Sequence, residues 1–300
     1  MSDSRRRKSK SLSVSVVGSG RLGTALARAL ASSMYEVEAV VTRRIANARR
    51  AAKLLGPATQ PLSEDQLHRL PASKILFITT PDAEILKTAT RIAGLDGSSK
   101  GRTVLHTSGA LSASEVLAPL AAAGFSTGSI HPLVSISESR IGAEKLRGAF
   151  YCIEGDAVAR RVARSIVRDL EGHSFYISSN YKPLYHAAAV MASGHVTALV
   201  AIAIDTLTQC GLDRRTARRV LRPLLESTMA NLSASGPEVA LTGTFARGDL
   251  VTVRRHLQAL SNKQFAAALA AYKLLGRRSL ALTQQKIDSK TRKQILKALK

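Results

Sequence analysis

Residues 12–23 read Leu-Ser-Val-Ser-Val-Val-Gly-Ser-Gly-Arg-Leu-Gly, and this stretch decides the fold. Its first half, Leu12–Val17, alternates and then runs apolar with β-branched residues, which is typical of a buried strand. Glycines stand at the first, third and sixth positions of its second half, and the alanine- and leucine-rich segment 24–33 follows as a predicted helix. A second apolar strand, Val37–Thr42, completes a strand, turn, helix, strand unit.

A glycine turn in this position is typical of a dinucleotide-binding unit of the Rossmann type. Gly18 permits the tight turn, Gly20 lets the backbone approach a pyrophosphate, and Gly23 lets the helix pack closely on the strand. Free amides and the helix N-terminus would then hold the phosphates. The alternative is a glycine-rich turn with no ligand. The expected cofactor-binding residues of the turn are Gly18, Ser19, Gly20, Arg21, Leu22 and Gly23.

The end of the second strand indicates which dinucleotide binds. NAD-specific sites usually place a carboxylate there for the ribose 2′-hydroxyl, whereas this chain has Thr42, Arg43 and Arg44. Two guanidinium groups suit a 2′-phosphate. We therefore expect NADP(H) rather than NAD(H), the alternative being two solvent-facing arginines in a basic protein.

The strand and helix pattern continues to about residue 179. Buried strands alternating with amphipathic helices predict an α/β fold, a doubly wound, mostly parallel sheet occupying residues 12–179. The expected later strands are 74–79, 103–107, 125–130, 149–154 and 174–177, and the expected helices between them are 83–93, 113–123 and 157–170.

Beyond Asn180 the strand signals end, and an all-α domain is expected at 180–278. Its predicted helices are 184–209, 213–233, 250–260 and 262–275, separated by glycine-containing breaks. Basic tails are expected at 1–11 and 279–300.

The composition is that of a folded protein with a net charge of +23 and two cysteines, Cys152 and Cys210, which form no metal or disulfide pattern. Much of the basic excess lies in the two predicted tails, so we expect at most non-specific adhesion to nucleic acid. No apolar stretch follows the basic N-terminus as in a secretory signal, so a cytoplasmic protein is expected. Segment 187–204 is apolar but contains Gly194 and His195, and a buried central helix is expected rather than a membrane span.

Polar side chains follow several predicted strands, where active sites of such sheets lie. The nicotinamide is expected near Thr80, Pro81 and Ser108. Lys182 and His186 lie one helical turn apart, and either Lys182 or His186 is expected to transfer the proton, while Ser108 and His131 orient the substrate. For His106 and His131 the alternative is a backbone hydrogen bond at a strand end, and His195 is expected to be a core residue. The scattered histidines predict no metal.

Four motifs carry a resemblance to a known family. The chain is similar, over about residues 13–275, to bacterial Rossmann-like proteins with a helical C-terminal domain of unknown function, which are generally named as candidate NADP-dependent oxidoreductases. More distantly it resembles pyrroline-5-carboxylate reductase, β-hydroxyacid dehydrogenases and prephenate dehydrogenase. The motifs are His106–Ser112, Gly128–Leu133, Tyr185–Ser193 and Leu241–Asp249.

The resemblance implies a helical domain that completes the active site and forms a homodimer. It also exposes a departure, because Gly194 follows Ala192 and Ser193 where the family has asparagine. In the dehydrogenases an asparagine near that place helps a catalytic lysine hold the substrate. A smaller departure is Thr244, where the family tends to have proline.

These observations predict an NADP(H)-dependent oxidoreductase acting on a small, anionic carbonyl, imine or hydroxy acid. The alternative is a dinucleotide-binding protein without turnover, a redox sensor or scaffold acting through its basic tails. Gly194 favours the alternative, and the glycine turn does not discriminate between the two.

Overall fold

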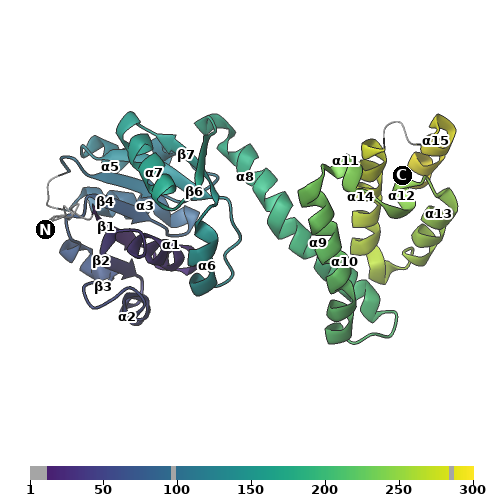
Figure 1. The fold of residues 1–300 in the computed structure, drawn as a ribbon, viewed down its shortest axis with the longest axis horizontal. Coiled ribbons are helices and arrows are strands. Elements are labelled where there is room, and N and C mark those ends of the chain that lie inside the picture. The colour runs from purple at the N-terminus through teal and green to yellow at the C-terminus, as the bar shows by residue number, and fades with distance from the viewer. Residues whose placement is uncertain (1–11, 96–98, 284–286) are drawn as a thin grey trace, which may run out of the picture. The chain divides into compact units, whose positions relative to one another are not determined.

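The computed structural model describes residues 12–95, 99–283 and 287–300, and the chain divides into two compact units, Met1–Val190 and Met191–Lys300 (Figure 1). The predicted N-terminal tail, 1–11, lies outside the described residues. The division falls eleven residues later than the predicted boundary at 179. The reason is that the helix beginning at Lys182 buries that lysine against the strands of the first unit.

The first unit contains an eight-stranded sheet in the order β3-β2-β1-β4-β5-β6-β7-β8. Every neighbouring pair is parallel except β6 and β7, which are antiparallel, so the predicted mostly parallel sheet is confirmed. The strands are β1 (Leu12–Val17), β2 (Tyr35–Thr42), β3 (Gln60–Ser63), β4 (Ile75–Ile78), β5 (Thr103–His106), β6 (Ser126–Pro132), β7 (Phe150–Gly155) and β8 (His173–Tyr176).

Helices cover both faces of this sheet, as expected for buried parallel strands. They are α1 (Arg21–Ala31), α2 (Ile45–Lys53), η1 (Glu64–Arg69), α3 (Asp82–Ala93), α4 (Ala113–Val116), α5 (Ala118–Ala122), α6 (Ser139–Leu146), α7 (Ala157–Asp169), η2 (Ser179–Tyr181) and α8 (Lys182–Val190). The predicted single helix 113–123 is two short helices that meet at Leu117.

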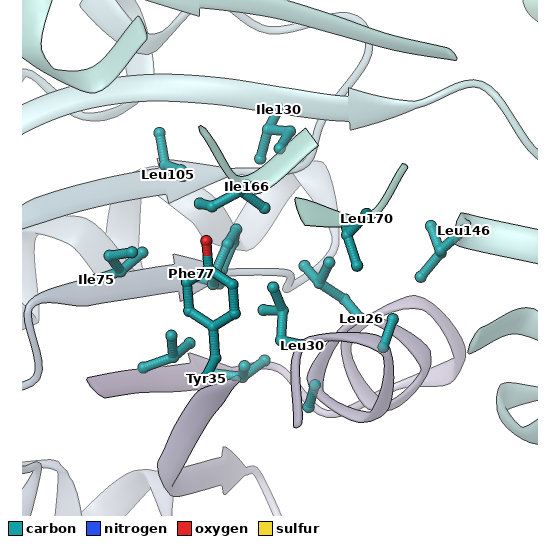
Figure 2. Packing of buried hydrophobic residues seen from close by; sticks show 14 of the residues in the cluster. Leu26, Leu30, Tyr35, Ile75, Phe77, Leu105, Ile130, Leu146, Ile166 and Leu170 are labelled. Carbon is teal, nitrogen blue, oxygen red and sulfur yellow. The ribbon is translucent and has the colours of Figure 1, made fainter. Parts of the chain in front are cut away.

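Two hydrophobic clusters lie on opposite faces of the sheet because strand side chains alternate between faces. Val14 and Val16 of β1 pack with α1, α6 and α7, whereas Val17 packs with α3, α4 and α5. Figure 2 shows the first cluster, which includes Leu30, Tyr35 and Phe77.

The strand order reverses direction between β1 and β4, which are neighbours in the sheet. Connections from these two strands leave toward opposite sides, so a crevice opens beyond their carboxyl ends, and open α/β sheets bind ligands there. The glycine turn follows β1 directly, and Thr79–Pro81 follow β4. The fold therefore brings both sequence motifs to one place.

The second unit is entirely helical in its described residues. It contains the π-helical turn η3 (Met191–His195), α9 (Val196–Thr208), α10 (Arg214–Ala234), α11 (Pro237–Ala240), α12 (Gly243–Ala246), α13 (Leu250–Ala259), η4 (Lys263–Phe265), α14 (Ala266–Leu282) and α15 (Ser289–Ala298). Residues 279–300 were predicted to be a basic tail, but the structure has the helix α15 there. Ile295 in α15 and Leu299, which follows it, are buried against Val253 and Leu280. Its apolar residues at helical spacing bring it into the folded unit.

The apolar helix expected to be buried is largely exposed. Within the described residues, Ser179–Thr208 is long and apolar enough to span a membrane, with a mean hydropathy of 1.9, and only 6% of its apolar window is buried. Length and composition alone are weak evidence for a span. His195, expected in the core, is also exposed. The C-terminal part of the helix, α9, packs against α10 and α14, but this packing leaves most of the apolar side chains exposed.

Candidate active site

Gly18 and Gly23 of the glycine turn stand at backbone positions that admit no side chain. Gly18 has φ +104°, and its amide donates to the carbonyl of Val41 at 2.8 Å. A Cβ on Gly18 would lie 2.6 Å from the amide nitrogen of Thr80, and one on Gly23 would lie 2.5 Å from the carbonyl oxygen of Gly18. At Gly20 a Cβ would meet nothing closer than 3.9 Å, so open space lies beside this residue.

A cleft of about 660 Å³ opens in front of this turn. Two buried hydroxyls at its edge, Ser19 Oγ and Thr80 Oγ1, have no hydrogen-bond partner within the described part of the chain. Buried polar groups are nearly always satisfied, so these two hydroxyls are available to hydrogen-bond a molecule in the cleft. The cleft is lined by Gly18–Leu22, Thr42–Arg44, Asn47, Glu64, Thr79–Asp82, Thr107 and Ser108.

Three residues at the end of β2 line the same cleft, namely Thr42, Arg43 and Arg44. Arg43 and Arg44 are exposed, and their guanidinium groups make no hydrogen bond or ion pair with the residues that the structure describes. Thr42 is buried and donates its hydroxyl to the carbonyl of Arg44 at 2.7 Å, so it shapes the turn. The cleft also contains Glu64, whose carboxylate lies 3.6 Å from Arg91.

A second pocket of about 300 Å³ adjoins the cleft and shares with it Arg21, Leu22, Asp82, Thr107 and Ser108. It is also lined by His131 from β6 and His186 from α8, with ring centroids 5.7 Å apart. Gly109 lies between them, since a Cβ there would be 2.6 Å from His186 Cδ2 and 2.9 Å from His131 Nε2. The structure thus brings these two predicted residues together beside the cofactor cleft.

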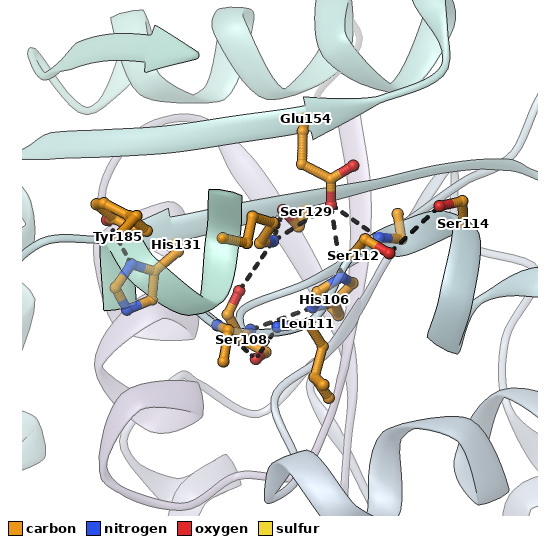
Figure 3. A network of polar contacts seen from close by, with 12 residues as sticks. His106, Ser108, Leu111, Ser112, Ser114, Ser129, His131, Glu154 and Tyr185 are labelled. Atoms are coloured by element: carbon orange, nitrogen blue, oxygen red, sulfur yellow. Dashed lines mark hydrogen bonds and ion pairs between the residues drawn. The ribbon is translucent and has the colours of Figure 1, made fainter. Parts of the chain in front are cut away.

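Lys182 is not in this pocket. Its side chain is 0% exposed, and its ammonium donates to Ser129 Oγ at 2.7 Å, to the carbonyl of Ser108 at 3.2 Å and to Glu154 Oε1 at 3.2 Å. Figure 3 labels these three partner residues. All three ammonium hydrogens are thereby used. The expectation that Lys182 transfers the proton does not fit this burial, and the geometry makes it an anchor for the start of α8.

Ser108 likewise differs from its expected role. Its hydroxyl donates to Asp82 Oδ2 at 2.9 Å and accepts from the amides of Ala110 and Leu111, both at 3.1 Å. The hydroxyl is therefore occupied in shaping the loop after β5 and is not free to orient a substrate. His106 is fully buried, and its Nδ1 accepts from the amide of Ser108 at 3.2 Å, which matches the backbone alternative.

Burial and positive charge act on the histidines. The pKa of His131 is lowered to about 4 by burial and by the charges of His186 and Lys182. Burial likewise lowers the pKa of His106 well below its usual range, and Lys182 adds to this effect. Both rings are therefore neutral at pH 7.

Three residues of the site were not predicted from the sequence as site residues. Glu154, Ser129 and Gly109 lie on or after three different strands, and only the strand order brings them near Lys182 and His186. Glu154 stood at the end of a predicted strand, where an acidic residue in an otherwise apolar run is the one available hint.

Family models match most of the chain. Residues 2–132 match the model of Rossmann-like domains, and residues 149–279 match a domain of unknown function, DUF2520. The chain joins a Rossmann-like domain to a DUF2520 domain. No curated protein matches its sequence.

Solved structures share the fold of this Rossmann-like and DUF2520 protein. A Bacteroides fragilis protein named as a candidate NADP oxidoreductase is 20% identical, with a TM-score of 0.73 over 91% of this chain and 99% of that one. A Thermotoga maritima protein is 23% identical, with a TM-score of 0.69 over 90% and 98% of the two chains. A reductive aminase from Aspergillus terreus, solved with NADPH and ethyl levulinate, is 16% identical, with a TM-score of 0.63 over 95% and 98%.

Replacing Gly109 with alanine tests the placement of the two histidines. The added methyl group would overlap both rings, so Gly109→Ala is expected to displace them and to lower turnover by about tenfold or more, with NADPH affinity unchanged. Steady-state kinetics and calorimetry check this. Gly94→Ala is the matched control, because a Cβ at exposed Gly94 meets nothing closer than 3.7 Å. Equal turnover in both variants would contradict the placement.

Proposed function

We propose that this protein is an NADP(H)-dependent oxidoreductase that reduces or oxidises a small molecule at the two-histidine pocket. The observation that carries the proposal is continuity: the cleft in front of the glycine turn and the histidine pocket share five lining residues. A dinucleotide lying along the cleft would therefore end where the histidines are.

The cleft fits the cofactor by the chemistry of its lining. The turn at Gly18–Gly23 and the N-terminus of α1 would hold the pyrophosphate, with the unpaired hydroxyls of Ser19 and Thr80 as additional hydrogen-bonding groups. Arg43 and Arg44 would hold the 2′-phosphate that distinguishes NADPH from NADH. Structures with this fold include complexes with NADP(H).

In the proposed reaction the cofactor provides the hydride, and side chains of the pocket provide the proton and orient the substrate. When bound, NADPH supplies a hydride to an electrophilic carbon. His186 supplies the proton that the product's heteroatom takes up, and in the reverse direction it accepts that proton. His131, neutral at pH 7, makes a hydrogen bond to the reacting group and orients it.

The pocket indicates a small substrate with an apolar side. Its volume of about 300 Å³ is at the lower limit for ligand pockets. Leu22, Pro132, Val134 and Ile136 form the apolar side, and exposed Arg21 supplies a positive charge suited to an anionic substituent.

Cofactor preference is tested by removing both guanidinium groups. Arg43→Ala combined with Arg44→Ala is expected to weaken NADPH binding by about tenfold or more, with a much smaller effect on NADH. Calorimetric titration with each dinucleotide measures this. Arg161→Ala, an exposed arginine on α7, is the control and should change neither affinity. Equal losses for the two dinucleotides would refute the assignment to the 2′-phosphate.

Catalysis is tested at His186. After a screen of ketones, keto acids and cyclic imines with NADPH, His186→Ala is expected to lower kcat by about two orders of magnitude, while the Kd for NADPH stays within error of the wild type. NADPH oxidation followed by absorbance gives the first quantity and calorimetry the second. Cofactor binding without turnover on any compound would instead support a non-catalytic sensor or scaffold.

We further propose that a second copy of the chain covers the exposed apolar residues of the helical unit. Val220 and Leu224 lie one turn apart on α10 and are 53% and 61% exposed, and Leu199 on α9 is 40% exposed. Large apolar side chains exposed one turn apart on the same helix favour an interaction surface, and a homodimer would bury them.

Charge on α10 tests the dimer. Val220→Asp combined with Leu224→Asp is expected to give a monomer, because carboxylates in an apolar interface lose their hydration. Sedimentation equilibrium measures the mass. Ser233→Asp places one carboxylate on the opposite side of α10 and should leave the wild-type mass unchanged. A monomeric wild type, or a dimeric double variant, would contradict the proposal.

A further inference from the structure

A tyrosine lies behind the histidine that faces the pocket. Tyr185 Oη is 2.7 Å from His131 Nδ1, and the two rings meet edge to face with centroids 5.6 Å apart (Figure 3). The tyrosine is held by a further edge contact with Phe175, at 5.8 Å between centroids. The Nδ1 side of His131 is thus occupied, and its Nε2 points the other way, toward Gly109 and the pocket.

The direction of the hydrogen bond decides where the imidazole proton lies. A phenol is a better donor than an acceptor, and a pyridine-type nitrogen is the better acceptor of the pair. Tyr185 Oη has no second hydrogen-bond partner among the described residues. If Nδ1 donated to the phenol oxygen, the phenol hydrogen would have no acceptor among the residues that the structure describes. The favoured arrangement is O–H donating to Nδ1, with the histidine proton on Nε2.

The groups around His131 keep the ring neutral. His186 and Tyr185 approach it from α8, and Lys182, also on α8, adds a buried positive charge. Arg21 from α1 and Asp82 from α3 line the same pocket, and the Asp82 carboxylate accepts from Ser108. Burial and these positive charges lower the pKa of His131 to about 4. Burial also raises the pKa of the Tyr185 phenol, so its hydroxyl keeps its proton.

We propose that Tyr185 fixes His131 as the Nε2–H tautomer, and that the pocket therefore takes a substrate with a carbonyl oxygen rather than a protonated iminium. An Nε2–H donor needs a lone pair opposite it, which a carbonyl oxygen has and an iminium nitrogen lacks. An iminium would also bring a positive charge next to Arg21, which lines the pocket. Tyr185 is thus a positioning residue that acts through His131. The inference about the substrate class rests on the proposed function, whereas the inference about the tautomer of His131 does not.

The tautomer is measured directly, without turnover. Long-range ¹H–¹⁵N correlation spectra of the full chain distinguish pyrrole-type from pyridine-type ring nitrogens, and His131→Asn assigns the signals. We expect a pyrrole-type Nε2 and a pyridine-type Nδ1 at pH 7, and in Tyr185→Phe a mixture of tautomers. The helical unit offers a matched control, because His256 Nδ1 lies 2.9 Å from Tyr272 Oη. Tyr272→Phe should change the His256 signals and leave those of His131 unaltered.

The substrate class is measured with two probes of one ring size, cyclopentanone and the N-methyl-1-pyrrolinium cation, each added with NADP⁺ present. We expect cyclopentanone to shift the His131 Nε2–H signal and the pyrrolinium to leave it unmoved at the same concentration. A wild-type ring protonated at Nδ1, or a Tyr185→Phe spectrum identical to the wild type, would overturn the tautomer assignment. A pyrrolinium shift equal to or larger than that of the ketone, or no ketone shift, would overturn the substrate class. Failure of NADPH to bind would refute the proposed function and leave the tautomer result standing.

Discussion

The buried ion pair between Lys182 and Glu154 determines where the functional groups of the first unit lie. Both side chains are almost completely inaccessible, at 0% and 6%. Burying charges is costly unless the pair is well aligned and every remaining hydrogen is bonded. Here Ser129 and the Ser108 carbonyl take the other ammonium hydrogens, and the Ala113 amide donates to the glutamate at 2.8 Å. The pair thereby ties together α8, β6, β7 and the loop after β5.

This anchor explains why two side chains further along α8 face the sheet. Residues three and four positions after Lys182 lie on the same side of the helix, so Tyr185 and His186 follow it toward β6. Tyr185 then reaches His131, and His186 lines the pocket beside Gly109. The same ammonium also acts over distance, because its charge contributes to the lowered pKa of His131. One lysine therefore positions α8 and adds to the effect of burial and of His186 on the pKa of His131.

The sequence predicted the parts of this arrangement that local patterns encode. The glycine turn, the strands on either side of it and the arginines after β2 are consecutive, so their geometry follows from short-range rules. The strand β3 and helix α2 were missed because Gln60–Ser63 is short and contains proline, and Ile45–Lys53 has few large apolar residues. Lys182 was predicted to transfer a proton, but the structure buries its side chain in an ion pair outside the pocket. Its partners, Glu154 and Ser129, lie on β7 and β6, and the order of these strands in the sheet cannot be predicted from the spacing of residues along the sequence.

The most direct test of the account measures the coupling between Lys182 and Glu154. Amide hydrogen exchange in β6 and β7 reports opening of the sheet unit alone, and a double-mutant cycle uses Lys182→Met, Glu154→Gln and the two together. Each single variant leaves a buried group unpaired, so Lys182→Met is expected to lower the opening free energy by about 3–5 kcal/mol. The double variant should lose clearly less than the sum of the single losses. Two results would contradict the claim that this ion pair holds α8, with His186, on the sheet. One is additive losses in the cycle, and the other is a loss of less than about 1 kcal/mol in Lys182→Met, as is typical of an exposed pair.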